Sequence, residues 1–376
     1  MIIHIILAIV ASFLIAIFAI PSIITVAKLK NLYDKPEERK IHTLKIPRLG
    51  GLAIFVSFAI AVLLFGDFTG IEGAKYIAAS LIILFFSGLK DDIIILSPMK
   101  KLYSQLIAAG LVSGIAAIRI TDLHGVFGIN EIPWIASTLL SMFMIIVITN
   151  SINLIDGVDG LAGSLSFIMS LTFGYFFYLN NDFNWMLISL ALGGAILGFL
   201  FFNFSPARIF MGDSGSLTVG FLLSIFTIHF IESNGPNAGS YFTLRSAPGI
   251  ALAILVVPLY DTLRVFILRA IKRTSPFKAD KNHLHHWLIK NGQSHKQVTL
   301  ILSLVNVLFI LISMAIKDNP AYLVMLVIGT LALIVGQLPI YFYRHRISDI
   351  EADENVRDEI EQSLFQEPVR RKEDSL

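Results

Sequence analysis

Residues 2–27 read IIHIILAIVASFLIAIFAIPSIITVA, an apolar run without Asp, Glu, Lys or Arg. A helix of about 20 such residues crosses the hydrocarbon core of a bilayer. The run is longer than a signal-peptide core and no basic residue precedes it, so we interpret it as a membrane-spanning helix. The composition agrees, because 55% of the 376 residues are hydrophobic and only 15% are charged, whereas soluble domains carry about 25% charged residues.

Apolar stretches of this kind recur along most of the chain. The sequence therefore predicts an all-α polytopic membrane protein with about eleven transmembrane helices. Some stretches are short and are expected to be tilted or sunk between their neighbours. The eleven stretches are 3–27, 49–66, 74–89, 102–119, 134–152, 164–179, 185–202, 216–231, 248–268, 298–316 and 321–342.

The basic residues predict the orientation of these helices. Of the 29 Lys and Arg residues, 25 fall on the side that contains the loop 28–48. The positive-inside rule then places the N-terminus in the periplasm and the C-terminus in the cytoplasm. A membrane-embedded domain, 1–342, is predicted to precede a charged cytoplasmic tail, 343–376, with a short helix. The cytoplasmic loops are 28–48, 90–101, 150–163, 203–215 and 264–297.

Composition also excludes several kinds of chemistry. The net charge is only +2, so nothing in the overall charge points to a nucleic-acid partner. The chain contains no Cys, which excludes thiolate catalysis, disulfides, iron–sulfur clusters and cysteine-type zinc sites.

Carboxylates gather in two of the predicted cytoplasmic loops. Asp91 and Asp92 are adjacent at the inner end of the third stretch, and two neighbouring carboxylates favour a cation or a proton. Asn153, Asp156 and Asp159 are spaced by three, so one helical turn is expected to place them on one face. Lys and Arg are absent from the segment 150–163, which makes a metal ion a natural partner. Charged helix ends in water and an ordinary polar turn are the alternatives.

Two further loops carry groups that suit phosphate. Gly212-Asp213-Ser214-Gly-Ser precedes an apolar run, which predicts Asp or Ser at a helix N-cap, and helix N-termini bind phosphates. His283, His285 and His286 follow Lys278 and Lys281; this set lacks a complete zinc ligand pattern and is better suited to a diphosphate. Simple capping and a solvated basic loop are the alternatives here.

All four clusters fall on the face assigned from Lys and Arg alone. Carboxylates for Mg²⁺, a helix N-terminus and basic groups for phosphates together predict a phosphoryl-transfer site. Asp261 and Arg264, three residues apart at the inner end of the ninth stretch, are expected to form a structural ion pair.

The four clusters resemble the motifs of the polyprenyl-phosphate N-acetylhexosamine-1-phosphate transferases, in that family's order, over roughly residues 28 to 297. The matching motifs are Asp91-Asp92, Asn153-Leu-Ile-Asp156-Gly-Val-Asp159-Gly, Phe210-Met-Gly-Asp213-Ser-Gly-Ser and His283-Leu-His285-His286. This resemblance implies transfer of a sugar 1-phosphate from a UDP-N-acetylhexosamine to undecaprenyl phosphate, with release of UMP. It also implies Mg²⁺, with Mn²⁺ as an alternative, and a site on the cytoplasmic face of the bacterial inner membrane.

The resemblance also implies a role for each matching residue. Asp213 binds the metal, Phe210 stacks on uracil, and Asn153, Asn203 and Gly212 belong to the substrate-binding set. Asp156 or Asp159 helps to hold the nucleotide, Asp91-Asp92 activates the lipid phosphate, and His283, His285 and His286 contact the diphosphate. Positioning and metal contact are the alternatives to base catalysis for Asp91-Asp92, because a phosphate monoester has its second pKa near ~6. A basic residue before Gly50-Gly51 completes the site, and Lys45 and Arg48 are both candidates.

The His motif favours one branch of the family. Leu284 interrupts the histidines, which resembles the enzymes that start O-antigen, lipopolysaccharide-linked or teichoic-acid polymers from UDP-N-acetylglucosamine. A phospho-N-acetylmuramoyl-pentapeptide transferase is the alternative among enzymes, and a lipid-linked sugar transporter is the alternative of another class. Gly194 and Gly198 form a GxxxG motif that suits close helix packing within one chain or in a homodimer.

Overall fold

Helices make up nearly all the secondary structure of this protein. The computed structural model describes residues 1–32, 46–69, 71, 73–235, 243–273 and 282–365, with side chains described up to residue 346 and at 348. Within these ranges there is no β-strand, and the one strand-like pairing is an isolated bridge between Asp122 and Glu131. The predicted all-α class is confirmed.

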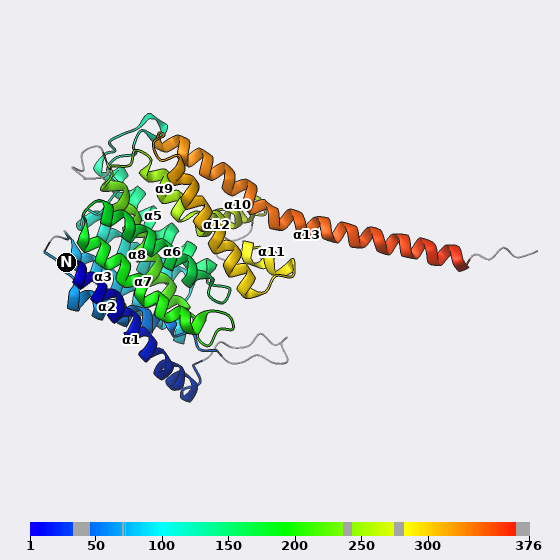
Figure 1. Ribbon diagram of the computed structural model, residues 1–376, viewed down its shortest axis with the longest axis horizontal. Coiled ribbons are helices and arrows are strands. Elements are labelled where there is room, and N and C mark those ends of the chain that lie inside the picture. Colours follow the sequence, from blue (N-terminus) through cyan, green and yellow to red (C-terminus); the bar gives the residue numbers. More distant parts are fainter. Residues whose placement is uncertain (33–45, 70, 72, 236–242, 274–281, 366–376) are drawn as a thin grey trace, which may run out of the picture.

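The described helices form a bundle from which one long helix projects (Figure 1). A π-helical turn, η1, continues α4, and a short 3-10 turn, η2, lies in the loop before α5. The elements are α1 Ile2–Leu29, α2 Gly50–Phe65, α3 Ala74–Ile93, α4 Pro98–Gly110, η1 Leu111–Ile115, η2 Val126–Gly128, α5 Trp134–Ile155, α6 Leu161–Leu179, α7 Phe183–Asn203, α8 Gly212–Glu232, α9 Ala247–Ile254, α10 Val256–Ile271, α11 Leu284–Lys290, α12 His295–Ala315 and α13 Ala321–Phe365.

Each predicted apolar stretch contains helix, but fewer helices meet the length and hydropathy expected of a span. Seven described helices are long and apolar enough to cross a membrane, or eight if the bent pair α9–α10 counts as one span. Helix α2 has 16 residues, and α3 continues past its apolar part through Asp91 and Asp92. The chain is therefore a multi-span protein, and the number eleven stays a prediction.

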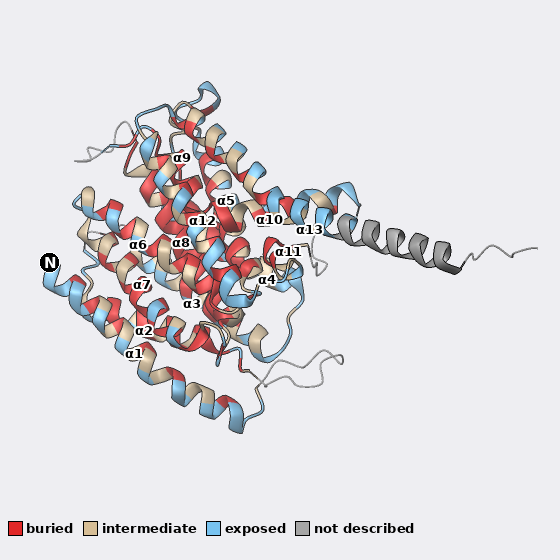
Figure 2. Ribbon diagram, turned by 45° about the vertical axis from the view of Figure 1, so that its right-hand side comes forward, coloured by how far each residue is buried: buried red, intermediate tan, exposed pale blue. Residues whose placement is uncertain are grey.

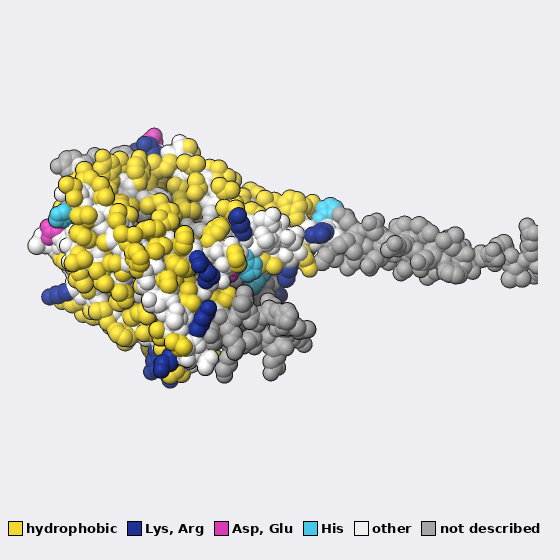
Figure 3. All heavy atoms as spheres, turned by 60° about the horizontal axis from the view of Figure 1, so that its bottom comes forward, with side chains coloured by type: hydrophobic (Ala, Val, Ile, Leu, Met, Phe, Trp, Pro, Cys, Tyr) yellow, Lys and Arg dark blue, Asp and Glu magenta, His cyan; other side chains and the backbone are white. Residues whose placement is uncertain are grey.

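Helix α8 forms the centre of the bundle. It contacts α2, α3, α5 and α6, and it is buried along nearly its whole length (Figure 2). Outer helices such as α1 and α13 instead expose many large apolar side chains. Apolar side chains likewise cover most of the face seen in Figure 3. An apolar exterior around a buried core is typical of a protein whose solvent is lipid.

The GxxxG motif packs two helices of the same chain. A Cβ on Gly194 would overlap the Ile9 carbonyl oxygen and the Ser12 hydroxyl of α1, and one on Gly198 would meet Ala16 at 2.7 Å. Glycine therefore permits the close approach of α7 to α1. Because this surface is used inside the chain, it offers no support for a homodimer.

The predicted span 248–268 is broken rather than continuous. Helices α9 and α10 meet at Leu255 with a bend of 78°. Pro258 has no N–H to donate to the Ile254 carbonyl, and the side-chain amide of Asn306 on α12 donates to that oxygen instead, at 3.1 Å. The predicted span is therefore bent at Leu255, and a buried side chain from another helix stabilises the break.

Helix α13 continues without interruption from the apolar bundle through the predicted boundary at residue 342. The helix expected in the tail is thus the end of α13 rather than a separate short segment. In Figure 1 this end projects well beyond the other helices.

Candidate active site

A polar cavity of about 380 Å³ lies where the ends of several helices meet. This size lies within the usual range for small-ligand pockets. Most of the residues singled out from the sequence line it. The lining residues are Arg48, Asp91, Asp92, Asn153, Asp156, Gly157, Val158, Asp159, Asn203, Phe210, Gly212, Asp213 and His295.

Glycines allow α2 and α3 to approach the start of α8 closely. A Cβ on Gly51 would overlap the backbone of Gly215, and one on Gly88 would overlap the Asp213 carbonyl. Only a residue without a side chain permits such contact. The glycines therefore position Asp92 and Asp213, which come from separate helices, within hydrogen-bond distance.

The Asp92 side chain, from α3, lies at the N-terminus of α8. Its Oδ1 accepts a hydrogen bond from the Asp213 N–H at 2.6 Å, and its Oδ2 accepts from the Ser214 N–H at 3.0 Å and the Ser214 hydroxyl at 2.6 Å. The N-cap position itself is Met211, which makes no side-chain capping bond. The predicted Asp or Ser N-cap was wrong, because a carboxylate from α3 satisfies these N–H groups.

Asp213 lies in the first turn of α8 and is held from both sides. Its Oδ1 accepts a hydrogen bond from the Asn153 amide at 2.5 Å, and its Oδ2 pairs with the ammonium of Lys101. The same Asn153 amide also reaches the Ser216 hydroxyl at 2.7 Å. Asp213 is thus oriented before any ligand arrives.

Lys101 is a site residue that the motif analysis missed. Besides Asp213, its ammonium pairs with Asp91 Oδ2 at 2.7 Å. Asp91 Oδ1 accepts from the Leu96 N–H at 2.5 Å. Lys101 entered the sequence analysis only as one of the positive charges that fix topology. No motif around Lys101 marks it as a site residue, because its pairing with Asp91 and Asp213 depends on the packing of α4 against α3.

The segment after α5 differs from the predicted single helical face. Helix α5 ends at Ile155, so Asn153 lies in its last turn, Asp156 follows as the C-cap, and Asp159 lies in the next turn. All three nevertheless line the cavity. Burial, together with the nearby charges of Asp213 and Asp92, raises the pKa of the Asp156 carboxyl well above its usual range. Asp156 therefore retains its proton to a higher pH than an ordinary Asp side chain does.

Asp159 is anchored by neighbours that the sequence analysis did not identify. Its carboxylate lies 3.3 Å from His295 Nδ1 and accepts from the Ala207 N–H at 3.1 Å, while its carbonyl accepts from the Thr299 hydroxyl at 2.8 Å. Burial alone would raise the pKa of the Asp159 carboxyl, but the hydrogen bonds from His295 and Ala207 hold it below the usual range. The Ser294 capping box that starts α12 positions His295.

Asn203, Phe210 and Arg48 are substrate-binding candidates that also line the cavity. Both ends of the Asn203 amide are bonded to backbone, since Oδ1 accepts from the Gly160 N–H at 2.9 Å and Nδ2 donates to the Ile209 carbonyl at 2.8 Å. Asn203 therefore shapes the loop that presents Phe210. Arg48 lines the cavity, whereas Lys45 lies outside the described residues.

Gly212 needs to be glycine for two reasons. Its φ is +71°, and a Cβ there would meet the Arg48 carbonyl and the Asp92 carboxylate. This position joins the Phe210 loop to the start of α8.

The three histidines do not line the cavity. Asp261 holds their loop, because its Oδ2 lies 2.8 Å from His283 Nδ1 and its Oδ1 accepts from the Leu284 N–H at 2.7 Å. The predicted Asp261–Arg264 pair also forms, at 3.5 Å. His285 is buried, and its Nε2 lies 2.8 Å from where a Cβ on Gly157 would be.

The protonation of His285 limits what it contributes to the site. Burial lowers the pKa of its imidazole to about 3, so the ring is neutral at physiological pH. His286 packs beside it, with ring centroids 4.3 Å apart. Lys278, Asp280 and Lys281, which precede this motif, lie outside the described residues.

The cavity suits a divalent cation that is bound partly by protein carboxylates and partly by the phosphates of a substrate. In the described part of the chain no three His, Asp or Glu side chains converge as a closed metal site. Asp91 and Asp213 do converge on one cation, the Lys101 ammonium. Mg²⁺ is typically bound by one or two carboxylates together with substrate phosphates, so these two carboxylates suit Mg²⁺ better than a metal that requires a full protein cage.

Comparison with known proteins identifies the family of this chain. The family described as glycosyl transferase family 4 matches residues 74–231, which include Asp91, Asp92, Asn153 and Asp213. The chain is 33% identical over 332 residues to a probable undecaprenyl-phosphate N-acetylglucosaminyl 1-phosphate transferase of Bacillus subtilis, covering 88% of this chain and 90% of that protein.

Two further relatives have related names. The chain is 35% identical over 292 residues to a decaprenyl-phosphate N-acetylglucosaminephosphotransferase of Mycolicibacterium smegmatis, covering 72% and 71% of the two chains. It is 26% identical over 289 residues to an undecaprenyl-phosphate alpha-N-acetylglucosaminyl 1-phosphate transferase of Escherichia coli, covering 74% and 75%. The chain therefore belongs to glycosyl transferase family 4, the family of membrane phosphoglycosyltransferases that its motifs resemble.

Proposed function

We propose that this protein transfers N-acetylglucosamine 1-phosphate from UDP-N-acetylglucosamine to undecaprenyl phosphate and releases UMP. The observation that carries the proposal is the convergence of Asp91, Asp92, Asn153, Asp159 and Asp213 on one cavity. The names of the relatives support this donor and acceptor over the muramoyl-pentapeptide and transporter alternatives. The reaction starts a cell-envelope polysaccharide such as O-antigen or a teichoic-acid linkage unit.

In the proposed reaction, an oxygen of the lipid phosphate forms a bond to the phosphorus that carries the sugar. The bond from that phosphorus to the UMP oxygen breaks, and UMP leaves with the electron pair. A phosphate monoester has its second pKa near ~6, so the acceptor is already mostly dianionic at neutral pH. The acceptor therefore needs positioning more than it needs a general base.

Asp213 is the proposed ligand of Mg²⁺, with Mn²⁺ as an alternative. The bound cation supplies charge neutralisation for the diphosphate and the leaving UMP. Asp92 positions Asp213 through the N-terminus of α8, and Asp91 orients Lys101. We assign Asp92 to positioning because both of its oxygens bond the first turn of α8, whereas Asp91 faces the same ammonium as Asp213 and can contribute to the cation site.

The nucleotide is proposed to lie on the side of the cavity formed by Asp159, Phe210 and Asn203. Phe210 offers a ring to stack on uracil, and Asn203 and Gly212 hold its loop in place. Arg48 and Lys101 supply positive charge for phosphates. His285 is neutral and is proposed to contact the diphosphate by hydrogen bonding rather than by charge.

We further propose that the chain crosses the bacterial inner membrane eleven times, with its N-terminus outside and its C-terminus inside. Helices α2, α3 with its polar end, and α4 extended by η1 supply the three spans that fall below the length or hydropathy expected of a single span. The cavity then faces the cytoplasm, where UDP-sugars are made. The basic loops and the tail remain on the same side.

A donor panel tests the proposed function. Purified protein in detergent is given undecaprenyl phosphate, Mg²⁺ and one UDP-sugar at a time, and UMP release is measured. UMP from UDP-N-acetylglucosamine that is lost on addition of EDTA is the expected result. UMP only from the muramoyl-pentapeptide donor would overturn the donor assignment, and no UMP from any UDP-sugar in a folded sample would overturn the reaction.

A further inference from the structure

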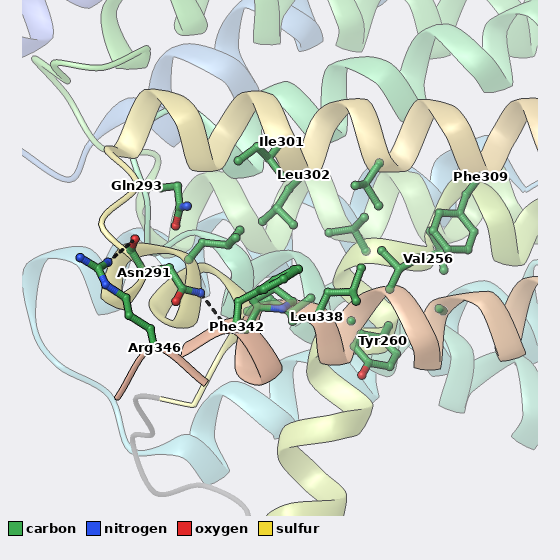
Figure 4. A pocket seen from close by; sticks show the side chains of 18 residues that line it. Val256, Tyr260, Asn291, Gln293, Ile301, Leu302, Phe309, Leu338, Phe342 and Arg346 are labelled. Carbon is green, nitrogen blue, oxygen red and sulfur yellow. Dashed lines mark hydrogen bonds between the residues drawn. The ribbon is translucent and has the colours of Figure 1, made fainter. Parts of the chain in front are cut away.

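A second cavity, of about 410 Å³, lies between α10, α11, α12 and α13. In Figure 4 its walls are mainly aliphatic and aromatic side chains, with Val256 and Phe309 at one end and Leu302 and Leu338 along its length. Cavities with such walls stay free of water. A hydrocarbon chain in this cavity would make dispersion contacts with its lining side chains.

The two ends of this cavity differ in polarity. Asn291, Gln293 and Arg346 lie together at the end opposite Phe309 (Figure 4). The Arg346 guanidinium donates one hydrogen bond to the Asn291 carbonyl at 3.3 Å, and no other bond to it is found among the side chains that the structure describes. A guanidinium has five N–H donors, so an exposed cation with further donors lies at this end. An apolar cavity with a cationic end matches a molecule that has a hydrocarbon chain and an anionic head.

The cavity is separate from the catalytic cavity. Among the described residues, none lines both. Helix α11 lies between them: Leu284 and Leu288, four residues apart on one face, line the apolar cavity, whereas His285 points to Gly157 of the catalytic cavity. An acceptor whose phosphate is at Asp213 would have to pass α11 to place its chain here.

We propose that this cavity binds one acyl chain of an anionic phospholipid whose phosphate lies at Arg346. The bilayer supplies such lipids at high local concentration, and basic pockets between transmembrane helices on the cytoplasmic side are suited to anionic headgroups. The site shares no lining residue with the catalytic cavity among the described residues, so lipid binding here is tested separately from the proposed donor and acceptor.

The bound lipid also supports α11. This helix is already joined to α13, because the Asn291 amide donates to the Pro339 carbonyl at 2.7 Å and the Trp287 and Tyr343 rings meet at 5.3 Å. An acyl chain against Leu284 and Leu288 fills the remaining side. The lipid therefore holds the helix that carries His285 in its place against Gly157.

Photo-crosslinking tests the site directly. The full chain is placed in phosphatidylcholine nanodiscs that contain phosphatidylglycerol with a diazirine in one acyl chain, and labelled peptides are mapped. Labelling of α12 and α13 residues that line the cavity is expected. Ala332→Phe, which fills the cavity, should reduce this labelling about tenfold. Leu333→Phe, at an exposed neighbouring position of α13, should leave it unchanged.

Competition tests the headgroup. Unlabelled phosphatidylglycerol should compete about tenfold better than phosphatidylcholine, because Arg346 adds a charge-assisted hydrogen bond. Arg346→Gln should abolish this preference, whereas Arg344→Gln should retain it. Equal competition by both lipids in the unaltered protein overturns the anionic site, and competition by undecaprenyl phosphate alone assigns the cavity to the acceptor. These two measurements decide the question even if Ala332→Phe fails to fold.

Discussion

Replacing Asp92 with Asn distinguishes two roles for this carboxylate: positioning Asp213 and acting as a general base. The Asp92 carboxylate accepts three hydrogen bonds from Asp213 and Ser214 at 2.6, 3.0 and 2.6 Å. Asn keeps one acceptor oxygen and turns an NH₂ group toward a backbone or hydroxyl donor. A buried donor left without its acceptor costs about 1–3 kcal/mol, so Asp92→Asn should cost about 2 kcal/mol in the placement of Asp213.

This cost should appear in the binding of Mg²⁺. About 2 kcal/mol corresponds to a roughly 30-fold rise in the Mg²⁺ concentration needed for half-maximal UMP release. At saturating Mg²⁺, kcat should return to within about threefold of the original, because the acceptor needs no deprotonation. Ser214→Ala, which removes only one of the three donors, should cause a smaller shift of about fivefold.

The opposite result would refute this reasoning. Loss of a general base lowers kcat by about 10²–10⁴ at every Mg²⁺ concentration. If added Mg²⁺ fails to restore Asp92→Asn, the carboxylate takes a proton in the reaction and its bonds to α8 are secondary.

Four further outcomes are expected. Asp213→Asn should lower UMP release by at least ~10²-fold with an unchanged melting temperature profile in detergent, and retained turnover would contradict the metal assignment. His295→Ala should raise the KM for the UDP-sugar several-fold through the loosened Asp159 carboxylate while leaving the KM for the lipid acceptor unaltered; equal changes in both would contradict a nucleotide role. The pKa of His285 is about 3 in the folded protein, below its ordinary value of 6.5. The stability associated with the neutral ring is therefore complete above pH 6.5 and is lost as the pH falls toward 3. His285→Gln should flatten the decline in melting temperature between pH 6 and 4, and an unchanged decline would contradict the low pKa. Gly51→Ala should destabilise the protein by about 1–3 kcal/mol, because the new Cβ would meet the Gly215 backbone. Gly329→Ala on α13 should leave the stability unchanged, because no atom lies within 4 Å of the new Cβ; thermal unfolding in detergent measures both.

The sequence alone was sufficient for the helical class and for naming most of the residues that line the candidate site. Apolar runs mark spans because a bilayer demands about 20 apolar residues in succession, and that requirement is local. The carboxylates of Asp91, Asp156 and Asp213 were identifiable because polar groups at a membrane face are costly. The family motifs then grouped these residues before their distances were known.

Other features depend on contacts between distant segments. Asp92 satisfies the start of α8, Lys101 pairs with Asp213, and His295 holds Asp159, yet no spacing along the chain relates these partners. The break after Ile254 likewise depends on Asn306 of another helix. Hydropathy is a property of each residue and its solvent, whereas hydrogen bonds and ion pairs depend on which helices pack together. The sequence therefore determined which residues the site contains. The tertiary structure decided which of them hold one another in place.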